Sequence, residues 1–124
     1  MSFIAITNNS VFRDKYEGKF DISFADVPLH DIFILVRDKV HAGHEILSHP
    51  LSGSVKPGET PYKTVFIAGK KGSLNMDSLA LIENAIMTCS KFEDRKYDYE
   101  KKIEDFQLID LSLAESALAG IRGY

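Results

Sequence analysis

The sequence predicts a small α/β sandwich, a single domain over residues 1–124, in which helices cover a mostly parallel sheet of four or five strands. Three observations support this fold class. The 124 residues suit one compact domain. Hydrophobic residues make up 44% of the chain and charged residues 27%, so a core can form without a metal or disulfide. Short apolar or β-branched runs alternate with helical patterns, as in sheets whose parallel strands are joined through helices.

The first three predicted elements lie before residue 25. The apolar run Phe3–Thr7 is predicted to be a buried strand. Asn9 or Ser10 is expected to cap a short helix over residues 11–17. Residues 20–24 alternate between large apolar and polar side chains, which indicates a strand with one wet face near a sheet edge.

The middle of the chain is predicted to form one helix and two strands. Asp26 is expected to cap a helix that has Pro28 in its first turn and that ends at Gly43. Its apolar residues recur at spacings of three and four: Leu29, Ile32, Phe33, Val36 and Val40. Residues 45–48 are predicted to form a short third strand, and the β-branched and aromatic residues 62–68 a fourth.

The C-terminal part is predicted to hold two helices and a short strand. Asn75 or Asp77 is expected to cap the first helix. The highly charged residues 91–105 leave two interpretations open, a continuation of that helix or an exposed connection. Residues 106–109 are predicted to form a short strand, and a capping-box pattern opens a final helix over residues 112–121.

Composition argues against several classes of protein. A formal net charge of −3 lacks the basic footprint that non-specific nucleic-acid binding needs. No apolar run approaches the length of a membrane-spanning helix. The single Cys89 excludes an internal disulfide, suits a reducing compartment and is expected to be a small buried hydrophobe. We therefore expect a cytoplasmic protein that binds neither nucleic acid nor a membrane and carries no cofactor.

Residues 41–63 form the most informative segment, because they contain three of the four His and three of the four Pro. The histidines follow the spacing His-x2-His-x4-His. A zinc site needs three or four ligands that converge on one point. A short predicted strand separates His44 from His49 and directs them toward opposite ends, so we predict no metal site.

The loop at residues 49–61 is the strongest candidate for a binding site. Gly53 and Gly58 allow close backbone approach, hydroxyl groups are abundant, and Lys56 and Lys63 add positive charge, a combination that can cradle a phosphate or carboxylate. A rigid, proline-braced connection explains the same residues, and both interpretations stay open. In a parallel sheet this loop and Asn8-Asn9 would share one rim. The predicted ligand-binding residues are Asn8, Asn9, His49, Ser52, Ser54, Lys56, Thr60 and Tyr62.

The same segment resembles the hallmark segment of the GrdX family. The residues that carry the resemblance are Gly43, His44, Leu47, His49, Pro50, Leu51, Gly53, Ser54, Lys56, Pro57, Thr60, Pro61 and Tyr62. Three shorter strings are also similar: Ile6-Thr7-Asn8-Asn9, Val36-Arg37-Asp38 and Asp77-Ser78-Leu79. The resemblance implies an association with the glycine/sarcosine/betaine reductase system of amino-acid-fermenting anaerobes. It supplies no catalytic residue.

Three functions follow as expectations. The first is a non-catalytic accessory or binding protein, whose partners would be a small anionic metabolite and components of glycine reductase. The second is a small enzyme acting on a phosphorylated or carboxylated metabolite, with His49 as acid/base. The third is a homo-oligomeric scaffold with the charged residues 91–105 at an interface. The residues leave all three open.

Overall fold

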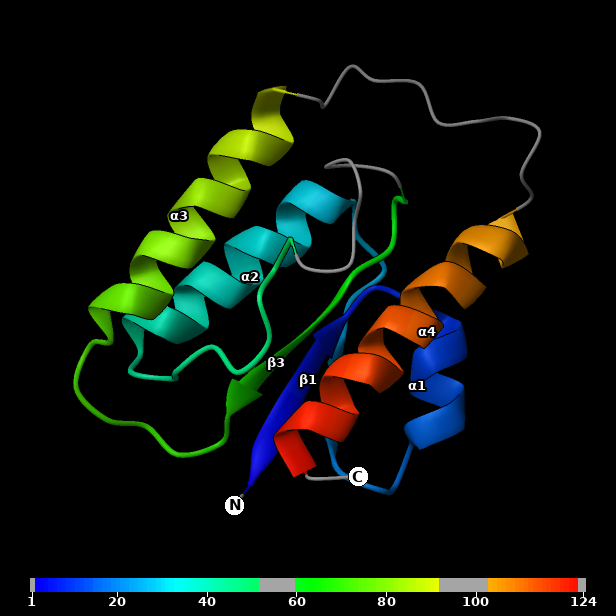
Figure 1. The fold of residues 1–124 in the computed structure, drawn as a ribbon, viewed down its shortest axis with the longest axis horizontal. Coiled ribbons are helices and arrows are strands. Elements are labelled where there is room, and N and C mark those ends of the chain that lie inside the picture. The colour runs from blue at the N-terminus through cyan, green and yellow to red at the C-terminus, as the bar shows by residue number, and fades with distance from the viewer. Residues whose placement is uncertain (1, 52–59, 92–102, 123–124) are drawn as a thin grey trace.

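The structure is a computed structural model that describes residues 2–51, 60–91 and 103–122. Three strands and four helices lie within those ranges. In chain order they are β1 (Phe3–Thr7), α1 (Ser10–Tyr16), β2 (Asp21–Phe24), α2 (Leu29–His41), β3 (Thr64–Ala68), α3 (Met76–Lys91) and α4 (Ile103–Arg122). The helices lie on both faces of the sheet, α2 and α3 on one side and α1 and α4 on the other (Figure 1).

The described sheet is mixed and has three strands in the order β2-β1-β3. β1 runs parallel to β2, with Ile6 opposite Ser23, and antiparallel to β3, with Ile6 opposite Val65. The prediction of a mostly parallel sheet of four or five strands is therefore wrong. The predicted strands at residues 45–48 and 106–109 account for the difference.

Residues 45–48 do run beside β3, but they pair with it only through the bridge between Ile46 and Ile67. The N–H groups of Leu47 and Ser48 both donate to the Phe66 carbonyl, at 2.8 and 3.3 Å. The Ser48 hydroxyl, rather than a backbone carbonyl, accepts the Phe66 N–H at 2.9 Å. Because a side chain replaces the main-chain partner, a regular ladder does not develop here. Residues 45–48 run antiparallel to β3, and β3 runs antiparallel to β1.

Residues 106–109 lie inside α4, which begins at Ile103 rather than at residue 112. Phe106, Ala114 and Leu118 are buried, and Ala114 and Leu118 belong to the hydrophobic cluster that also contains Phe12 and Phe66. Their spacing in multiples of four places them on one helical face. A short apolar run alone does not separate a strand from a buried helix turn, which explains the error. In the described part of the chain, no helix is both long and apolar enough to span a bilayer.

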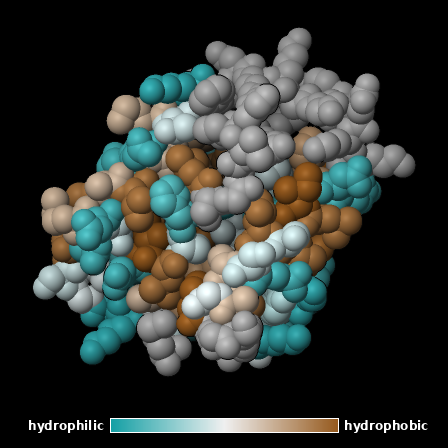
Figure 2. Space-filling model, in the orientation of Figure 1, coloured by the Kyte–Doolittle hydropathy of each residue, from teal (hydrophilic) through white to brown (hydrophobic). Residues whose placement is uncertain are grey.

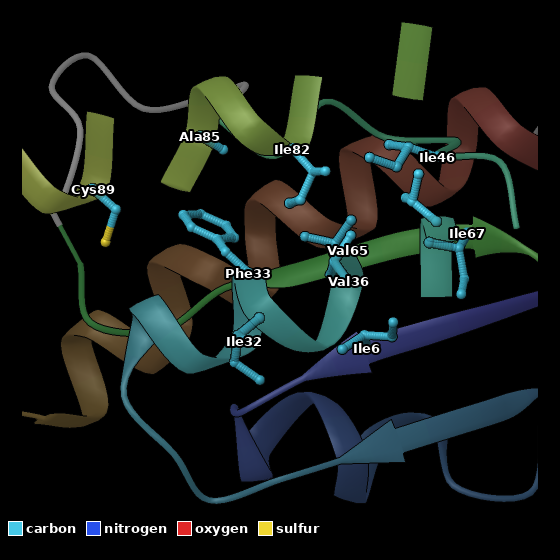
Figure 3. Close-up of a cluster of buried hydrophobic side chains, with 11 residues drawn as sticks. Ile6, Ile32, Phe33, Val36, Ile46, Val65, Ile67, Ile82, Ala85 and Cys89 are labelled. Atoms are coloured by element: carbon cyan, nitrogen blue, oxygen red, sulfur yellow. The ribbon is translucent and has the colours of Figure 1, made fainter. Parts of the chain in front are cut away.

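Each face of the sheet has its own core. Between the sheet and α2/α3 the buried side chains are mainly aliphatic, and they include Ile6, Phe33, Val36 and Ile82 (Figure 3). Cys89 lies at the end of this cluster and is buried, as expected. Between the sheet and α1/α4 the core is aromatic: Phe3, Phe12 and Phe66, with Tyr16 and Phe20 packed against them. On the surface seen in Figure 2, hydrophobic residues lie mostly near the centre and hydrophilic ones toward the periphery.

Local signals fix several helix ends. The Asn9 side chain accepts the Val11 N–H and caps α1, as predicted. Asn75 accepts the Ser78 N–H at 2.8 Å ahead of α3. Gly43 follows the C-cap of α2 with φ +106°, a conformation that favours glycine. The predicted capping role of Asp26 is wrong, because α2 begins after Pro28 without a side-chain cap.

Candidate functional site

Buried polar side chains gather at the edge of the sheet where β1 ends and β3 begins. We call this group the Asp110 cluster; its members are Thr7, Asn8, Asn9, Thr60, Lys63, Thr64 and Asp110. All seven are less than a tenth exposed. The predicted rim that joins Asn8-Asn9 to the 49–61 loop lies here, although for a different reason. β3 is antiparallel to β1, so the end of the loop meets the end of β1.

Asp110 is the centre of the cluster and is 1% exposed. Its carboxylate accepts hydrogen bonds from Asn9 Nδ2 (3.0 Å), Thr64 N (3.1 Å) and Thr64 Oγ1 (2.9 Å). Burial raises the pKa of Asp110, and this effect outweighs the lowering by its hydrogen-bond donors and by the charge of Lys63. Burial lowers the pKa of Lys63, and the negative charge of Asp110 offsets part of that change. The cluster thus holds two ionisable groups that desolvation pushes toward their neutral forms.

A chain of hydroxyl groups leads from β1 to Asp110. The Thr64 hydroxyl donates its proton to Asp110. In the 2.8 Å contact between the hydroxyls of Thr7 and Thr64, Thr7 is therefore the donor. Thr7 Oγ1 in turn accepts the Asn9 N–H at 3.0 Å. Every hydroxyl proton in this chain has one acceptor, which fixes the orientation of each side chain.

Asn8 ties three segments together. Its Nδ2 donates to the carbonyl oxygens of Val27 (2.9 Å) and Pro61 (3.0 Å), and its Oδ1 accepts the Lys63 N–H at 2.9 Å. Both amide protons are therefore used within the protein. A ligand that contacted Asn8 through these protons would have to displace one of the two carbonyls.

Asn9 has a similar role toward α4. Its Oδ1 accepts the Val11 N–H at 3.1 Å, and its Nδ2 donates to Asp110 and, at 2.9 Å, to the Gln107 carbonyl. One side chain thus caps α1 and holds α4 against the sheet. For both asparagines, ligand binding stays a prediction, and the contacts present are structural.

The described residues at the two ends of the 49–61 loop differ in their contacts, and only the residues at its end bind the rest of this edge. His49 is exposed, and its Nδ1 accepts the Leu51 N–H at 3.1 Å, so the imidazole proton lies on Nε2. Thr60 is buried; its hydroxyl donates to the Phe106 carbonyl at 3.4 Å and accepts the Tyr62 N–H at 3.2 Å. Tyr62 is half-buried, and burial, followed by the charges of Asp26 and Glu104, raises its pKa. The predicted ligand residues Ser52, Ser54 and Lys56 lie outside the described residues.

The three histidines of the segment do not meet at one point. His44 is buried and its Nδ1 contacts the Ala68 carbonyl at 2.7 Å, whereas His41 and His49 are exposed. Within residues 2–51, 60–91 and 103–122, no three His, Cys, Asp or Glu side chains are arranged to hold a metal ion.

Sequence reasoning missed the most buried charge of the cluster. Asp110 stands midway between Phe106 and Ala114 at spacings of four, so it interrupts an otherwise apolar helical face. A carboxylate in such a position is rarely buried unless it is paired. That signal was present in the sequence, but the prediction of a strand at residues 106–109 concealed it. The hydroxyls of Thr7 and Thr64 were missed because the hydrogen bond between them joins residues far apart in the chain.

Comparison with known proteins adds one match. A model of the GrdX-like protein family matches residues 4–119 and so includes the Asp110 cluster and the 49–61 loop. No curated protein and no solved structure matches the chain.

Proposed function

The chain belongs to the GrdX-like protein family, and on this premise we propose that it is an accessory or binding protein of the glycine/sarcosine/betaine reductase system. The match over residues 4–119 confirms the resemblance drawn from the sequence. The link to glycine reductase is what the family suggests. Cys89 is the single cysteine of the chain and is buried, which argues against a reductase subunit that turns over electrons through a pair of thiols.

We assign the contact surface of this accessory protein to the 49–61 loop. The observation that carries this assignment is that both ends of the loop are tied to the folded frame. Ser48, directly before the loop, is hydrogen-bonded to Phe66 of β3, and Thr60 and Pro61 at its end are hydrogen-bonded to Phe106 and Asn8. A loop with both ends fixed loses less conformational entropy on binding a ligand than one with a free end, which favours this segment as a binding surface.

The proposed ligand is a small anion with a phosphate or carboxylate group. Lys56 supplies the charge, Ser54 supplies a hydroxyl donor, and His49 directs Nε2–H either to the anion or to the loop itself. Thr60 and Tyr62 define the far end of the surface. Asn8 and Asn9 stabilise this end of the surface, because Asn8 donates to the Pro61 carbonyl and Asn9 donates to a carbonyl of α4.

Ligand-induced stabilisation tests this assignment. The full chain is heated with acetyl phosphate, inorganic phosphate or acetate, each at a series of concentrations. A ligand at about 100 times its Kd stabilises the folded state by roughly 2.7 kcal/mol, so the Tm rises by several degrees. Lys56→Ala should abolish the rise. Lys70→Ala is the matched control, because Lys70 is an exposed lysine beyond the other end of β3 and should leave the rise intact.

A flat Tm with all three anions would reject anion binding by this loop. An equal loss of the rise in both lysine variants would reject the assignment to Lys56. The link to the reductase is tested separately: the tagged chain is mixed with purified reductase components, and complex formation is measured by sedimentation. Failure to form a complex would reject the accessory role while leaving the anion site standing.

The second proposed function, a small enzyme with His49 as acid/base, has one observation in its favour. His49 is exposed at the start of the loop, and its Nδ1 accepts the Leu51 N–H, so in the neutral imidazole the proton lies on Nε2. Turnover of acetyl phosphate that disappears in His49→Ala, with the Tm of the unliganded chain unchanged, would establish this function in place of the first.

A further inference from the structure

The outer edge of β2 carries an arrangement that the proposed function does not use. Among the described residues, β2 pairs with β1 on one side and with no strand on the other. A surface pocket of about 340 Å³ lies between this edge strand and α1. Its lining comes from α1, β2 and the turn between them: Arg13, Glu17, Gly18, Phe20, Asp21, Ile22 and Phe24.

The apolar part of this pocket lies on the α1 side of the sheet. Phe20 and Ile22 pack against the aromatic core that α1 and α4 cover, and the Arg13 guanidinium lies 4.3 Å from the centre of the Phe24 ring. Phe20, Ile22 and Phe24 are two residues apart and share one face, whereas Asp21 and Ser23 face the other way. The edge therefore presents three partly exposed apolar side chains in a row.

The charges beside this row differ between its two ends. Arg13 lies over Phe24 at one end, and Glu17 lies next to the turn that leads into Phe20 at the other. Their separation of four residues corresponds to about 6 Å along α1. Asp14 forms an ion pair with Arg13 through Nε at 3.0 Å, so one end of the row presents the Nη groups of Arg13 and the other end presents the Glu17 carboxylate. A donor at one end and an acceptor at the other is a pattern that a two-fold axis makes self-complementary.

We propose that a second copy of this chain binds here, with β2 pairing antiparallel to β2 of the partner. A two-fold axis through Ile22 places Ile22 opposite its own equivalent and Phe20 opposite Phe24 of the partner copy. Residues directly opposite then share a face, as an antiparallel sheet requires.

The same register places unlike charges together. Arg13, which lies over Phe24, comes beside Glu17 of the other copy, and two such pairs form across the axis. Asp21 comes opposite Ser23 rather than opposite a second carboxylate, which avoids like-charge repulsion. The Arg13–Asp14 hydrogen bond uses Nε, so within the described residues the two Nη groups have no partner. The pairing would turn two three-stranded sheets into one continuous sheet.

Charge reversal tests the proposal on the full chain. The native protein should sediment at about 28 kDa, twice the 13.9 kDa of one chain. Arg13→Glu and Glu17→Arg each place like charges at both ends of the axis and should shift the protein to the monomer mass at the same concentration. The double variant R13E/E17R restores unlike pairs and should restore the dimer. Circular dichroism of all four proteins checks that each is folded.

A cysteine variant tests the register itself. Ile22→Cys places two thiols on the axis, within disulfide range, and oxidation should give a covalent dimer. Ser23→Cys is the matched control, because its Cα atoms would lie roughly 8 Å apart, beyond the reach of a disulfide. A native chain that stays monomeric at 200 µM would overturn the proposal. A dimer that survives both single charge reversals, or one that crosslinks through Ser23→Cys instead, would overturn this interface.

Discussion

On the face of the sheet that α2 and α3 cover, the buried contacts are mainly aliphatic, whereas the face that α1 and α4 cover contains an aromatic core and the charged Asp110 cluster. The first face is held by apolar packing between segments with clear helical periodicity. The second depends on hydrogen bonds that join residues about a hundred positions apart, such as Asn9 and Asp110. The comparison teaches that the periodic apolar pattern determines the packing of one face, whereas a few specific polar contacts determine the packing of the other.

The largest expected effect is on the aliphatic face. Phe33 is 1% exposed and packs within the α2/α3 core (Figure 3). Phe33→Ala should lower the free energy of unfolding by about 3–5 kcal/mol, because it removes buried apolar contacts and leaves a cavity. Leu35→Ala is the control on the same helix; Leu35 is 36% exposed and should cost about 0.5–1 kcal/mol. Urea unfolding measures both, and equal losses would show that this face is not held by packing.

A smaller loss is expected from the polar face. Asp110→Asn keeps the shape of the side chain but replaces one acceptor oxygen with an NH2 group that faces donors from Asn9 and Thr64. Because buried donors lose their acceptor, the variant should lose about 1–3 kcal/mol of unfolding free energy. Glu104→Gln, an exposed change on the same helix, should lie within about 0.5 kcal/mol of the native chain. A neutral Asp110→Asn would mean that the cluster does not hold α4.

The pH dependence distinguishes the two faces further. The pKa of Asp110 is raised in the folded state, so its titration adds to the free energy of unfolding at pH values below the unfolded pKa of 3.8. This stabilisation is lost as the pH rises through the folded pKa. Lys63 behaves in the opposite sense, because its pKa is lowered in the folded state. Its titration adds to the free energy of unfolding above the unfolded pKa of 10.5, and this stabilisation is lost as the pH falls through the folded pKa.

The unfolding free energy of the native chain minus that of Asp110→Asn should therefore fall as the pH rises from 3 to 7. Phe33→Ala, which removes no ionisable group, should differ from the native chain by a constant amount over the same range. Urea titrations at five pH values measure both differences. A native-minus-Asp110→Asn difference that rises with pH would show that hydrogen bonds and Lys63, rather than burial, dominate the pKa of Asp110.

The same contrast explains what could be predicted from sequence. Periodicity predicted β1, β2, α2 and α3 closely, because it depends on neighbours within a few residues. Capping signals predicted the starts of α1 and α3 but not that of α2. The direction of β3 could not be derived from periodicity, since it depends on which strand lies beside it. Residues 45–48 and 62–68 are nevertheless two strand-like runs without a helix between them, which favours an antiparallel connection.

For the candidate site, the sequence singled out residues that lie at this polar edge but not the residue at its centre. Asn8, Asn9 and Thr60 were selected as ligand contacts and do lie together, where their side chains hold one another and α4. Asp110 was not selected, because the strand predicted at residues 106–109 concealed its position on an apolar helical face. Hydrogen-bonding residues that precede and follow strands indicate a polar edge. They do not show whether their side chains bind a ligand or other segments of the protein.

The smallest expected effect concerns α4 alone and separates helix propensity from the Asp110 cluster. Gly120 lies in α4, is exposed, and would meet no atom within 4 Å if it carried a Cβ. Gly120→Ala should therefore raise the unfolding free energy by about 0.5 kcal/mol, somewhat less than in a helix centre because the residue is near the helix end. Gly18 also has open space but lies at φ +83°, so Gly18→Ala should instead cost about 1 kcal/mol. If Gly120→Ala adds its full effect to Asp110→Asn, helix propensity and the polar contacts stabilise α4 independently; a gain that vanishes in the double variant would mean that α4 is docked only through Asp110.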